Sequence, residues 1–477
     1  MAPTTKTCSL PTEIWFEIFR LLPLHALCSV HSVSSLFHDI SHSLLFHDFT
    51  LDPDRHKLSP EEFIQRLGMY SAEPIASHVR KLSISFQFGR WFRTRSGGFI
   101  NGLSSPTPLI APLLQTIPHF HNLRVLECTF RFNSEVHFAD LGLQELPNLR
   151  DLRIHGGAPY CPYLIPAKKI CVTHFSFTGI PSVRLEPGRA IRSFLSVLDP
   201  ATLSSLTLSP SYDCSPAVWL AYDHDLFPTF RQLRTVTIGC DGPFLRPVHD
   251  FLAHLPTLQN LTLSGEYRRC TEFAPTPDGP TLSPGLQSYT GPCEYIPLFL
   301  PGTACTRFAL NACCTPADLA RALGPAPALY TRAVTDLSLL LPLAPFCGWE
   351  SPHVLFTHFP RLATLRLVIS DAPLEDDPDM CDSAETVDPE ALVDLPDILA
   401  AVLRAPTELA HAVVEWDLFC DVVGMLPALA DLRALVPQVR IEFEGGVRAE
   451  GTGTDESTNT SASESGSDES METEGVY

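Results

Sequence analysis

Residues 233–264 read LRTVTIGCDGPFLRPVHDFLAHLPTLQNLTLS, and this stretch carries the pattern that decides the fold. At both of its ends an apolar residue is followed by two other residues, a second apolar residue, one other residue and a third apolar residue. The last two apolar positions alternate with polar ones, as in a strand that buries one face. Between the two copies, residues 247–258 form an amphipathic, helix-like run. The predicted unit is therefore a strand followed by a helix.

The same pattern recurs along most of the chain, with neighbouring copies usually about 23 to 31 residues apart. Longer gaps follow the copies that begin at residues 79, 258 and 362, and weaker copies within residues 286–310 partly fill the second gap. The clear copies are Val79/Leu82/Ile84, Leu123/Leu126/Cys128, Leu149/Leu152/Ile154, Val172/Phe175/Phe177, Leu203/Leu206/Leu208, Leu233/Val236/Ile238, Leu258/Leu261/Leu263, Val334/Leu337/Leu339 and Leu362/Leu365/Leu367.

In motif and period these units resemble leucine-rich repeats. The resemblance implies a curved α/β solenoid with a parallel sheet, because each unit has an apolar face that only its neighbours can cover. The asparagine that usually follows the final leucine by three positions is absent, so we expect an irregular array. The residues found there are Arg131, Gly157, Ser211, Asp241, Glu266 and Ser370. A generic α/β domain is the alternative.

A second informative stretch precedes the repeats, at residues 10–51. Apolar residues at i, i+4, i+7 and i+8, starting from Ile14, predict a first helix that ends before Pro23. A second helix is expected over residues 24–31, and Ser34 is a suitable cap for a third. Three helices of this size cannot bury all their apolar side chains among themselves, so part of this surface needs another partner.

This stretch resembles an F-box, the motif that docks a protein onto the Skp-type adaptor of a cullin–RING ubiquitin ligase. An LPxE start and a VSxxF end occur together in it. Two departures from the family pattern, at Pro23 and at Ser34-Ser35, remove no apolar anchor. The resemblance implies that the adaptor contacts are Leu10, Pro11, Ile14, Ile18, Leu21, Leu22, Leu24, Leu27, Val33 and Phe37. A helical hairpin packed on its own domain is the alternative.

Acidic residues concentrate in two segments near the end of the chain. Residues 371–390 contain nine and residues 449–477 contain eight, without Lys or Arg, so the two segments carry −17 of the net charge of −21. Segments this polar cannot form a core, and we expect both to be disordered. The nearly neutral remainder argues against nucleic acid as a partner.

These boundaries divide the chain into six parts. They are an F-box (8–51), a polar linker (52–77) with a short helix around residues 61–70, the solenoid (78–370), a disordered acidic insertion (371–390), a C-terminal repeat or cap with a helical end (391–446) and a disordered acidic tail (447–477).

Residues between and after the repeat leucines should project from the concave face of the solenoid, and most of them carry hydroxyl groups. We hypothesise that this face binds a protein target through hydrogen bonds, with specificity set near Asp151, Arg153 and His155. For most of these positions, a solvated strand residue is the alternative.

A basic, aromatic island follows the first repeat strand. Its arginines, Arg90, Arg93 and Arg95, could clamp a phosphate group on a target, because guanidinium groups match phosphate geometry. A solvated loop in an oversized repeat is the alternative.

No constellation of residues indicates catalysis. His38 and His42 have an i, i+4 spacing that can hold a metal, but no third ligand follows in a known pattern. We therefore expect no cofactor and no metal. The cysteines form no CxxC pair, and we find neither a signal-peptide pattern nor an 18-residue apolar run. These features predict a cytoplasmic or nuclear protein with reduced, mostly buried thiols and no membrane partner.

Together these expectations favour a substrate receptor of an SCF-type cullin–RING ubiquitin ligase. Its F-box would dock the Skp-type adaptor, and through it the cullin and RING subunits, while the solenoid selects a protein target. The protein itself would not be an enzyme. The alternative is a non-catalytic leucine-rich-repeat scaffold that has no link to ubiquitination.

Overall fold

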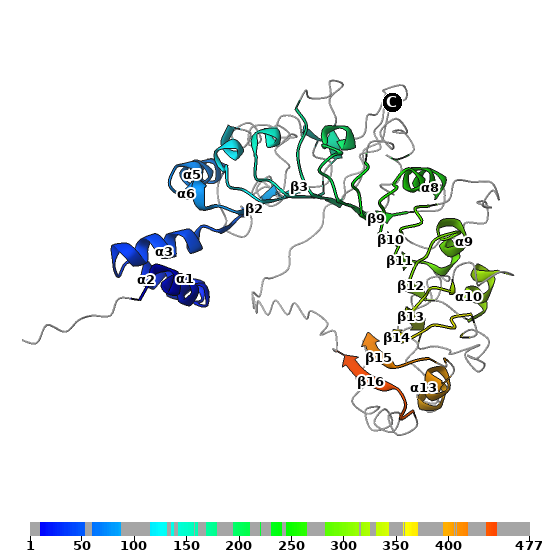
Figure 1. Ribbon diagram of the computed structural model, residues 1–477. Coiled ribbons are helices and arrows are strands. Elements are labelled where there is room, and N and C mark those ends of the chain that lie inside the picture. Colours follow the sequence, from blue (N-terminus) through cyan, green and yellow to red (C-terminus); the bar gives the residue numbers. More distant parts are fainter. Residues whose placement is uncertain are drawn as a thin grey trace, which may run out of the picture.

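The computed structural model shows a group of short helices followed by a long arch of strands and helices (Figure 1). The residues it describes are 10–52, 60–86, 115–130, 135–137, 142–156, 158–160, 168–178, 194–209, 220, 230–240, 245–264, 282–313, 316–324, 331–342, 356, 358–370, 395–404, 406, 408–417 and 436–445.

Three helices form the N-terminal group: α1 (Thr12–Arg20), α2 (Leu24–His31) and α3 (Ser35–Leu45). The bounds of α2 confirm the helix predicted for residues 24–31. The predicted cap of the third helix is also confirmed, because the backbone N–H of Phe37 donates to Oγ of Ser34 at 3.1 Å.

Fourteen parallel strands of the described residues form one sheet, in which each strand pairs with its neighbours along the chain. This order confirms the solenoid expected from the repeats. The strands are β1 (Asp48–Leu51), β2 (Lys81–Phe86), β3 (Val125–Phe130), β5 (Asp151–His155), β7 (His174–Thr178), β8 (Ser205–Ser209), β9 (Thr235–Gly239), β10 (Asn260–Ser264), β11 (Ser288–Gly291), β12 (Arg307–Cys313), β13 (Asp336–Pro342), β14 (Thr364–Ser370), β15 (His411–Asp417) and β16 (Arg440–Gly445). A separate pair joins β4 (Glu135–His137) and β6 (Ala158–Tyr160).

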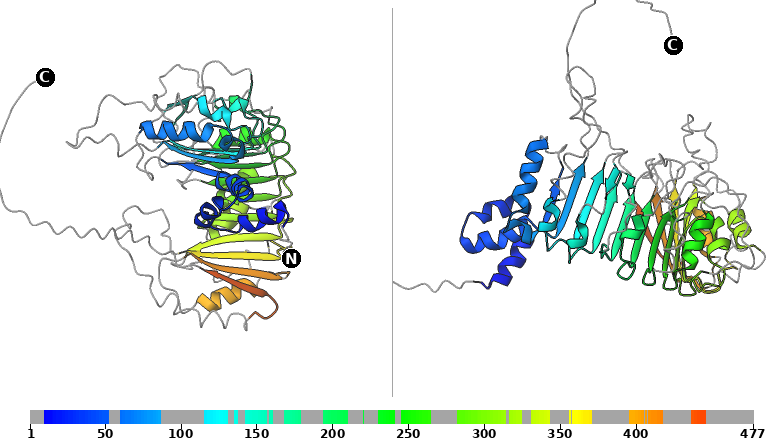
Figure 2. Two further views of the ribbon diagram at one scale, coloured as in Figure 1. Left: turned by 90° about the vertical axis from the view of Figure 1, so that its left-hand side faces the viewer. Right: turned by 90° about the horizontal axis from the view of Figure 1, so that it is seen from above.

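Helices lie on the outer side of the arch and the sheet lines its inner side (Figures 1 and 2). The α-helices are α5 (Pro60–Ser71), α6 (Ile75–His78), α8 (Leu245–Ala253), α9 (Ile296–Phe299), α10 (Pro316–Leu323) and α13 (Leu395–Arg404). Short 3-10 helices are η1 (Ile117–His119), η3 (Leu143–Glu145), η4 (Phe194–Val197) and η8 (Cys293–Tyr295). None of the helices within the described ranges is long and apolar enough to cross a membrane.

The core of the solenoid lies between the sheet and the outer helices. In every clear copy of the repeat, all three apolar positions are buried. Cys128 takes the place of a leucine, and burial raises the pKa of its thiol to about 12. Of the cysteines whose exposure is described, Cys128, Cys240, Cys293 and Cys305 are buried, whereas Cys28 and Cys171 are exposed.

The solenoid begins earlier than predicted. Strand β1, which falls within the F-box bounds of 8–51, pairs in parallel with β2. Helix α5 confirms the short helix expected around residues 61–70, but this segment is not a polar linker, because Phe63, Leu67 and Ala76 are fully buried in the solenoid core. Phe63, Ile64 and Leu67 form only one short apolar stripe, so the sequence indicates a helix there but not its burial in the solenoid core.

Of the C-terminal repeat or cap expected for residues 391–446, the structure shows a continuation of the solenoid, because β15 and β16 extend the sheet beyond β14. Helix α13 agrees with the helical end expected after residue 391, but residues 411–417 form strand β15 instead of continuing as helix. Ala412 and Val414 alternate with more exposed residues and are fully buried, as in the other repeat strands. The predicted acidic insertion (371–390) and tail (447–477) lie outside the described residues.

Candidate protein-interaction surfaces

The N-terminal helices share a small core of their own. Phe19 of α1, Leu27 of α2 and Ile40 of α3 are its buried members. The ring centroids of Trp15 and Phe37 are 4.8 Å apart, and those of Phe19 and Phe37 are 5.0 Å apart, both with edge-to-face geometry. These contacts turn one side of α1 inward.

Apolar side chains open to solvent also occur in this domain, on α1, α2, α3 and the segments beside them. We call the exposed apolar residues of this region the apolar face; they are Leu10, Ile14, Phe16, Ile18, Leu21, Leu24, Val33 and Leu36. Leu21 is 86% exposed, and Leu24 and Val33 are each 66% exposed. Large apolar side chains gathered in this way mark a surface that binds a protein or another apolar partner.

The structure divides the ten predicted adaptor contacts into three groups by their exposure. Exposed residues suited to contact a partner are Leu10, Pro11, Ile14, Ile18, Leu21, Leu24 and Val33. Leu22 and Phe37 are half-buried against the small core. Leu27 is only 7% exposed, so its assignment to the adaptor-binding surface is corrected: it holds the helices together. Phe16 and Leu36 are exposed and apolar as well but are not among the predicted contacts.

A comparison with protein families assigns this region. The model of F-box-like domains matches residues 7–52. Residues 7–52 form an F-box-like domain. The F-box-like domain therefore contains α1, α2, α3 and strand β1, and its last strand is at the same time the first strand of the solenoid.

The whole chain was also compared with curated proteins and with solved structures. No curated protein matches the chain. Among solved structures, the leucine-rich repeat-containing protein LegL7 from Legionella pneumophila is similar, with 10% sequence identity, coverage of 51% of this chain and 83% of that chain, and a TM-score of 0.30. The leucine-rich-repeat fold follows from the order of the strands in the sheet and from the burial of the repeat positions.

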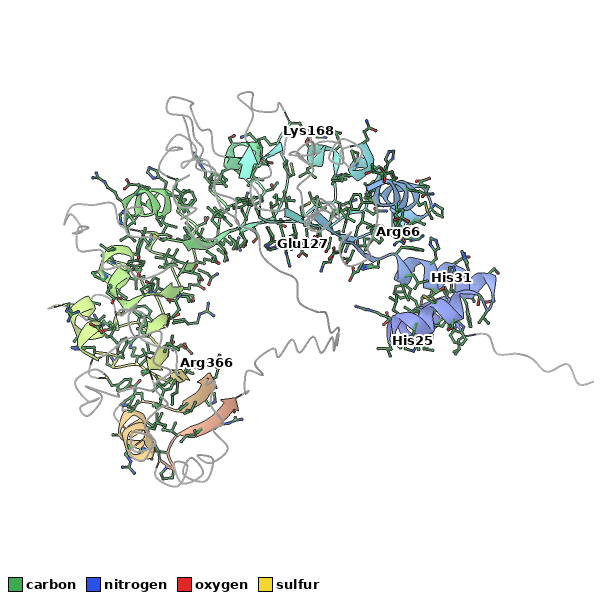
Figure 3. All side chains as sticks on the ribbon, turned by 180° about the vertical axis from the view of Figure 1, so that it is seen from behind. His25, His31, Arg66, Glu127, Lys168 and Arg366 are labelled. Atoms are coloured by element: carbon green, nitrogen blue, oxygen red, sulfur yellow. The ribbon has the colours of Figure 1, made fainter. Side chains whose placement is uncertain are left out.

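The concave face carries a charged network near its N-terminal end. The guanidinium group of Arg153 donates to the Asp151 carboxylate, at 2.7 Å from Nη2 and 3.1 Å from Nε to Oδ2. On the neighbouring strand, Glu127 accepts from Oγ of Ser83 at 3.4 Å and lies 3.6 Å from Nε2 of His155. Figure 3 shows Glu127 on the inner side of the arch.

The predicted residues Asp151, Arg153 and His155 thus do lie together on β5. The hydrogen bond to Asp151 raises the pKa of Arg153, so its charge is permanent and already paired. The three arginines of the predicted phosphate clamp, Arg90, Arg93 and Arg95, lie outside the described residues.

A second charged region lies at the C-terminal end of the concave face. Nε of Arg366 on β14 donates to Oε2 of Glu415 on β15 at 2.9 Å. Arg440 and Glu442 form another ion pair at 2.7 Å on β16. Arg366 points to the inner side of the arch in Figure 3.

Between the two charged regions runs an uncharged row that we call the hydroxyl band. Its members are half-exposed and lie in register on β7 to β11: Ser176, Thr207, Thr237, Thr262 and Thr290. The concave face therefore offers hydroxyl groups in its middle and paired charges toward both ends. Within the described ranges, no group of three His, Cys, Asp or Glu side chains is arranged to hold a metal ion.

Proposed function

We propose that this protein is the substrate receptor of an SCF-type cullin–RING ubiquitin ligase, acting in the cytoplasm or nucleus. The F-box-like domain docks a Skp-type adaptor, and the concave face of the solenoid binds the protein to be ubiquitinated. The observation that carries the proposal is the apolar face, which lies outside the small core of Phe19, Leu27 and Ile40 and is open to solvent. The family match supports the identity of the partner.

Burial of the apolar face by a partner would stabilise a complex. Full burial of one leucine or isoleucine side chain contributes about 1.5 to 3 kcal/mol. Several such side chains together offset the cost of association, which is on the order of 4 to 15 kcal/mol. The protein needs no active site for this role, because holding a target beside the ligase raises its effective concentration there.

Co-purification of the full chain with a Skp-type adaptor tests the docking step. We expect the wild type to retain the adaptor and the double variant Ile14→Asp/Leu24→Asp to lose it, because both carboxylates would be buried without partners. Met69→Asp on α5 is the matched control: Met69 is 58% exposed and apolar but lies outside the F-box-like domain. This control should bind as the wild type does.

Failure of the wild type to bind the adaptor would contradict the proposal and leave a leucine-rich-repeat scaffold outside the ubiquitin system. Loss of binding in Met69→Asp as well would show that the assay reports general surface charge. With docking established, accumulation of bound partners after proteasome inhibition distinguishes a degradation receptor from a scaffold.

The target-binding role of the concave face needs its own variants. Arg153→Ala/His155→Ala removes part of the charged network, whereas Thr207→Val/Thr237→Val removes hydroxyls with little change in side-chain shape. We expect partners recovered with the wild type to be lost in at least one of the two variants while adaptor binding stays unchanged. An identical set of partners in all three proteins would contradict target binding at these strands.

A further inference from the structure

Four histidine side chains meet where the F-box-like domain joins the solenoid. They are His31 on α2, His38 and His42 on α3, and His78 on α6. The ring centroids of His31 and His38 are 4.1 Å apart, those of His38 and His42 are 5.5 Å apart, and those of His42 and His78 are 5.2 Å apart. We call these four residues the histidine cluster; Figure 3 shows the position of His31.

The histidine cluster spans two parts of the molecule. Helices α2 and α3 belong to the F-box-like domain, whereas α6 packs in the first unit of the solenoid, with Ala76 fully buried in the solenoid core. Further ring contacts at this junction join His42 to Phe46, at 4.7 Å between centroids, and Tyr70 of α5 to Phe46 and Phe49, at 6.1 Å and 4.0 Å. The direction in which α3 leaves the solenoid therefore depends in part on the His42–His78 contact.

The surroundings of His42 disfavour a proton on its ring. Burial lowers the pKa of His42 below 6.5, and the neighbouring rings of His78, His38 and His31 lower it further. Asp39 acts in the opposite direction, and its carboxylate lies 3.4 Å from Nδ1 of His38. From α5, the side facing this junction presents the phenol ring of Tyr70. Burial and three neighbouring imidazole rings thus lower the pKa of His42, and the carboxylate of Asp39 opposes them.

We propose that the histidine cluster is a pH-sensitive joint, which holds the F-box-like domain against the solenoid at neutral pH and loosens in mild acid. The direction of this pH effect follows from the linkage between proton binding and stability. A histidine whose pKa is lower in the folded state binds its proton more readily when the contact is open. The stability that the closed joint contributes is therefore present above about pH 6.5 and is lost as the pH falls through the lowered pKa of His42.

Histidine ring NMR on the full-length protein tests the geometry directly. With 13Cε1-labelled histidine and assignment by single His→Gln variants, we expect the His42 resonance to titrate below pH 6.5 and to move upward in His78→Gln. Titration of His42 at or above pH 6.5, or a midpoint unchanged in His78→Gln, would overturn the proposal.

Hydrogen exchange between pH 7.5 and pH 5.5 tests the loosening itself. After correction for the pH dependence of intrinsic exchange, with strands β8 to β10 as internal reference, we expect α3 and α6 to lose protection at the lower pH. That loss should shrink in His42→Gln and in His78→Gln. His25→Gln, an exposed residue of α2 outside the cluster, should behave as the wild type. An equal loss of protection in all four proteins would overturn the proposal.

Discussion

The roles of single residues in the F-box-like domain depend on which way each side chain faces. Leu24 and Leu27 stand on the same helix, have the same side chain and both match the F-box pattern. Leu24 is 66% exposed, whereas Leu27 packs with Phe19 and Ile40. One leucine therefore belongs to the binding surface, and the other stabilises the domain.

This difference predicts opposite outcomes for the same substitution. Leu27→Ala should destabilise the F-box-like domain by about 2 to 5 kcal/mol, because it leaves a cavity in a small core. Leu24→Ala should change stability by less than about 0.5 kcal/mol but weaken adaptor binding. Hydrogen exchange in α1 to α3 measures the first effect and adaptor titration the second. Equal stability of the two variants would contradict the assignment of Leu27 to the core.

At the scale of helices and strands, some glycines occupy positions where a Cβ would clash, whereas others have free space around them. A Cβ at Gly291 in β11 would lie 2.6 Å from the Tyr289 hydroxyl. Tyr289 cannot move aside, because it is fully buried and its hydroxyl donates to the Pro292 carbonyl at 2.8 Å. A Cβ at Gly68 in α5 would meet nothing within 4 Å.

Alanine at these two glycines should therefore act in opposite directions. Gly68→Ala should raise the free energy of unfolding by about 0.5 to 1 kcal/mol, because alanine favours the interior of a helix. Gly291→Ala should lower it by about 1 to 3 kcal/mol through overpacking. Urea unfolding of the full chain measures both. A neutral Gly291→Ala would mean that Tyr289 can repack.

At the scale of the whole molecule, the solenoid is a one-dimensional stack. Each strand of the main sheet pairs only with its neighbours in the order β1 to β16 (Figure 2). Stability in such an array is close to a sum of the units and the interfaces between neighbours. A local defect near one end should therefore unfold that end before it affects distant repeats.

A matched pair of valines tests this expectation. Val236 in β9 and Val414 in β15 are both fully buried, but one lies in the middle of the array and the other near its end. Either Val→Ala substitution should cost about 2 kcal/mol, from two lost methyl groups and the cavity left behind. In Val414→Ala, hydrogen exchange should rise in β14 to β16 only. In Val236→Ala it should rise on both sides of β9. Faster exchange in β2 to β5 of Val414→Ala would contradict the one-dimensional behaviour.

Much of the fold could be predicted from the sequence because the repeat signal is local. Three apolar positions within six residues suffice to mark a buried strand, and every clear copy proved buried. Signals interrupted by charged residues were harder to detect. The sequence indicates the helix of α5 but not the burial of Phe63 and Leu67 in the solenoid core, and it predicts helix where strand β15 forms.

The sequence by itself determined the period of the solenoid, the three N-terminal helices and the motif of the F-box-like domain, because each depends on the spacing of side chains along one segment. Only the tertiary structure decided which apolar side of α1 and α2 is open to a partner. It also decided that Arg153 is paired with Asp151, and that histidines from three helices meet at one junction. The physical reason is that burial, ion pairing and pKa depend on neighbours distant in sequence, which only the packing of separate elements brings into contact.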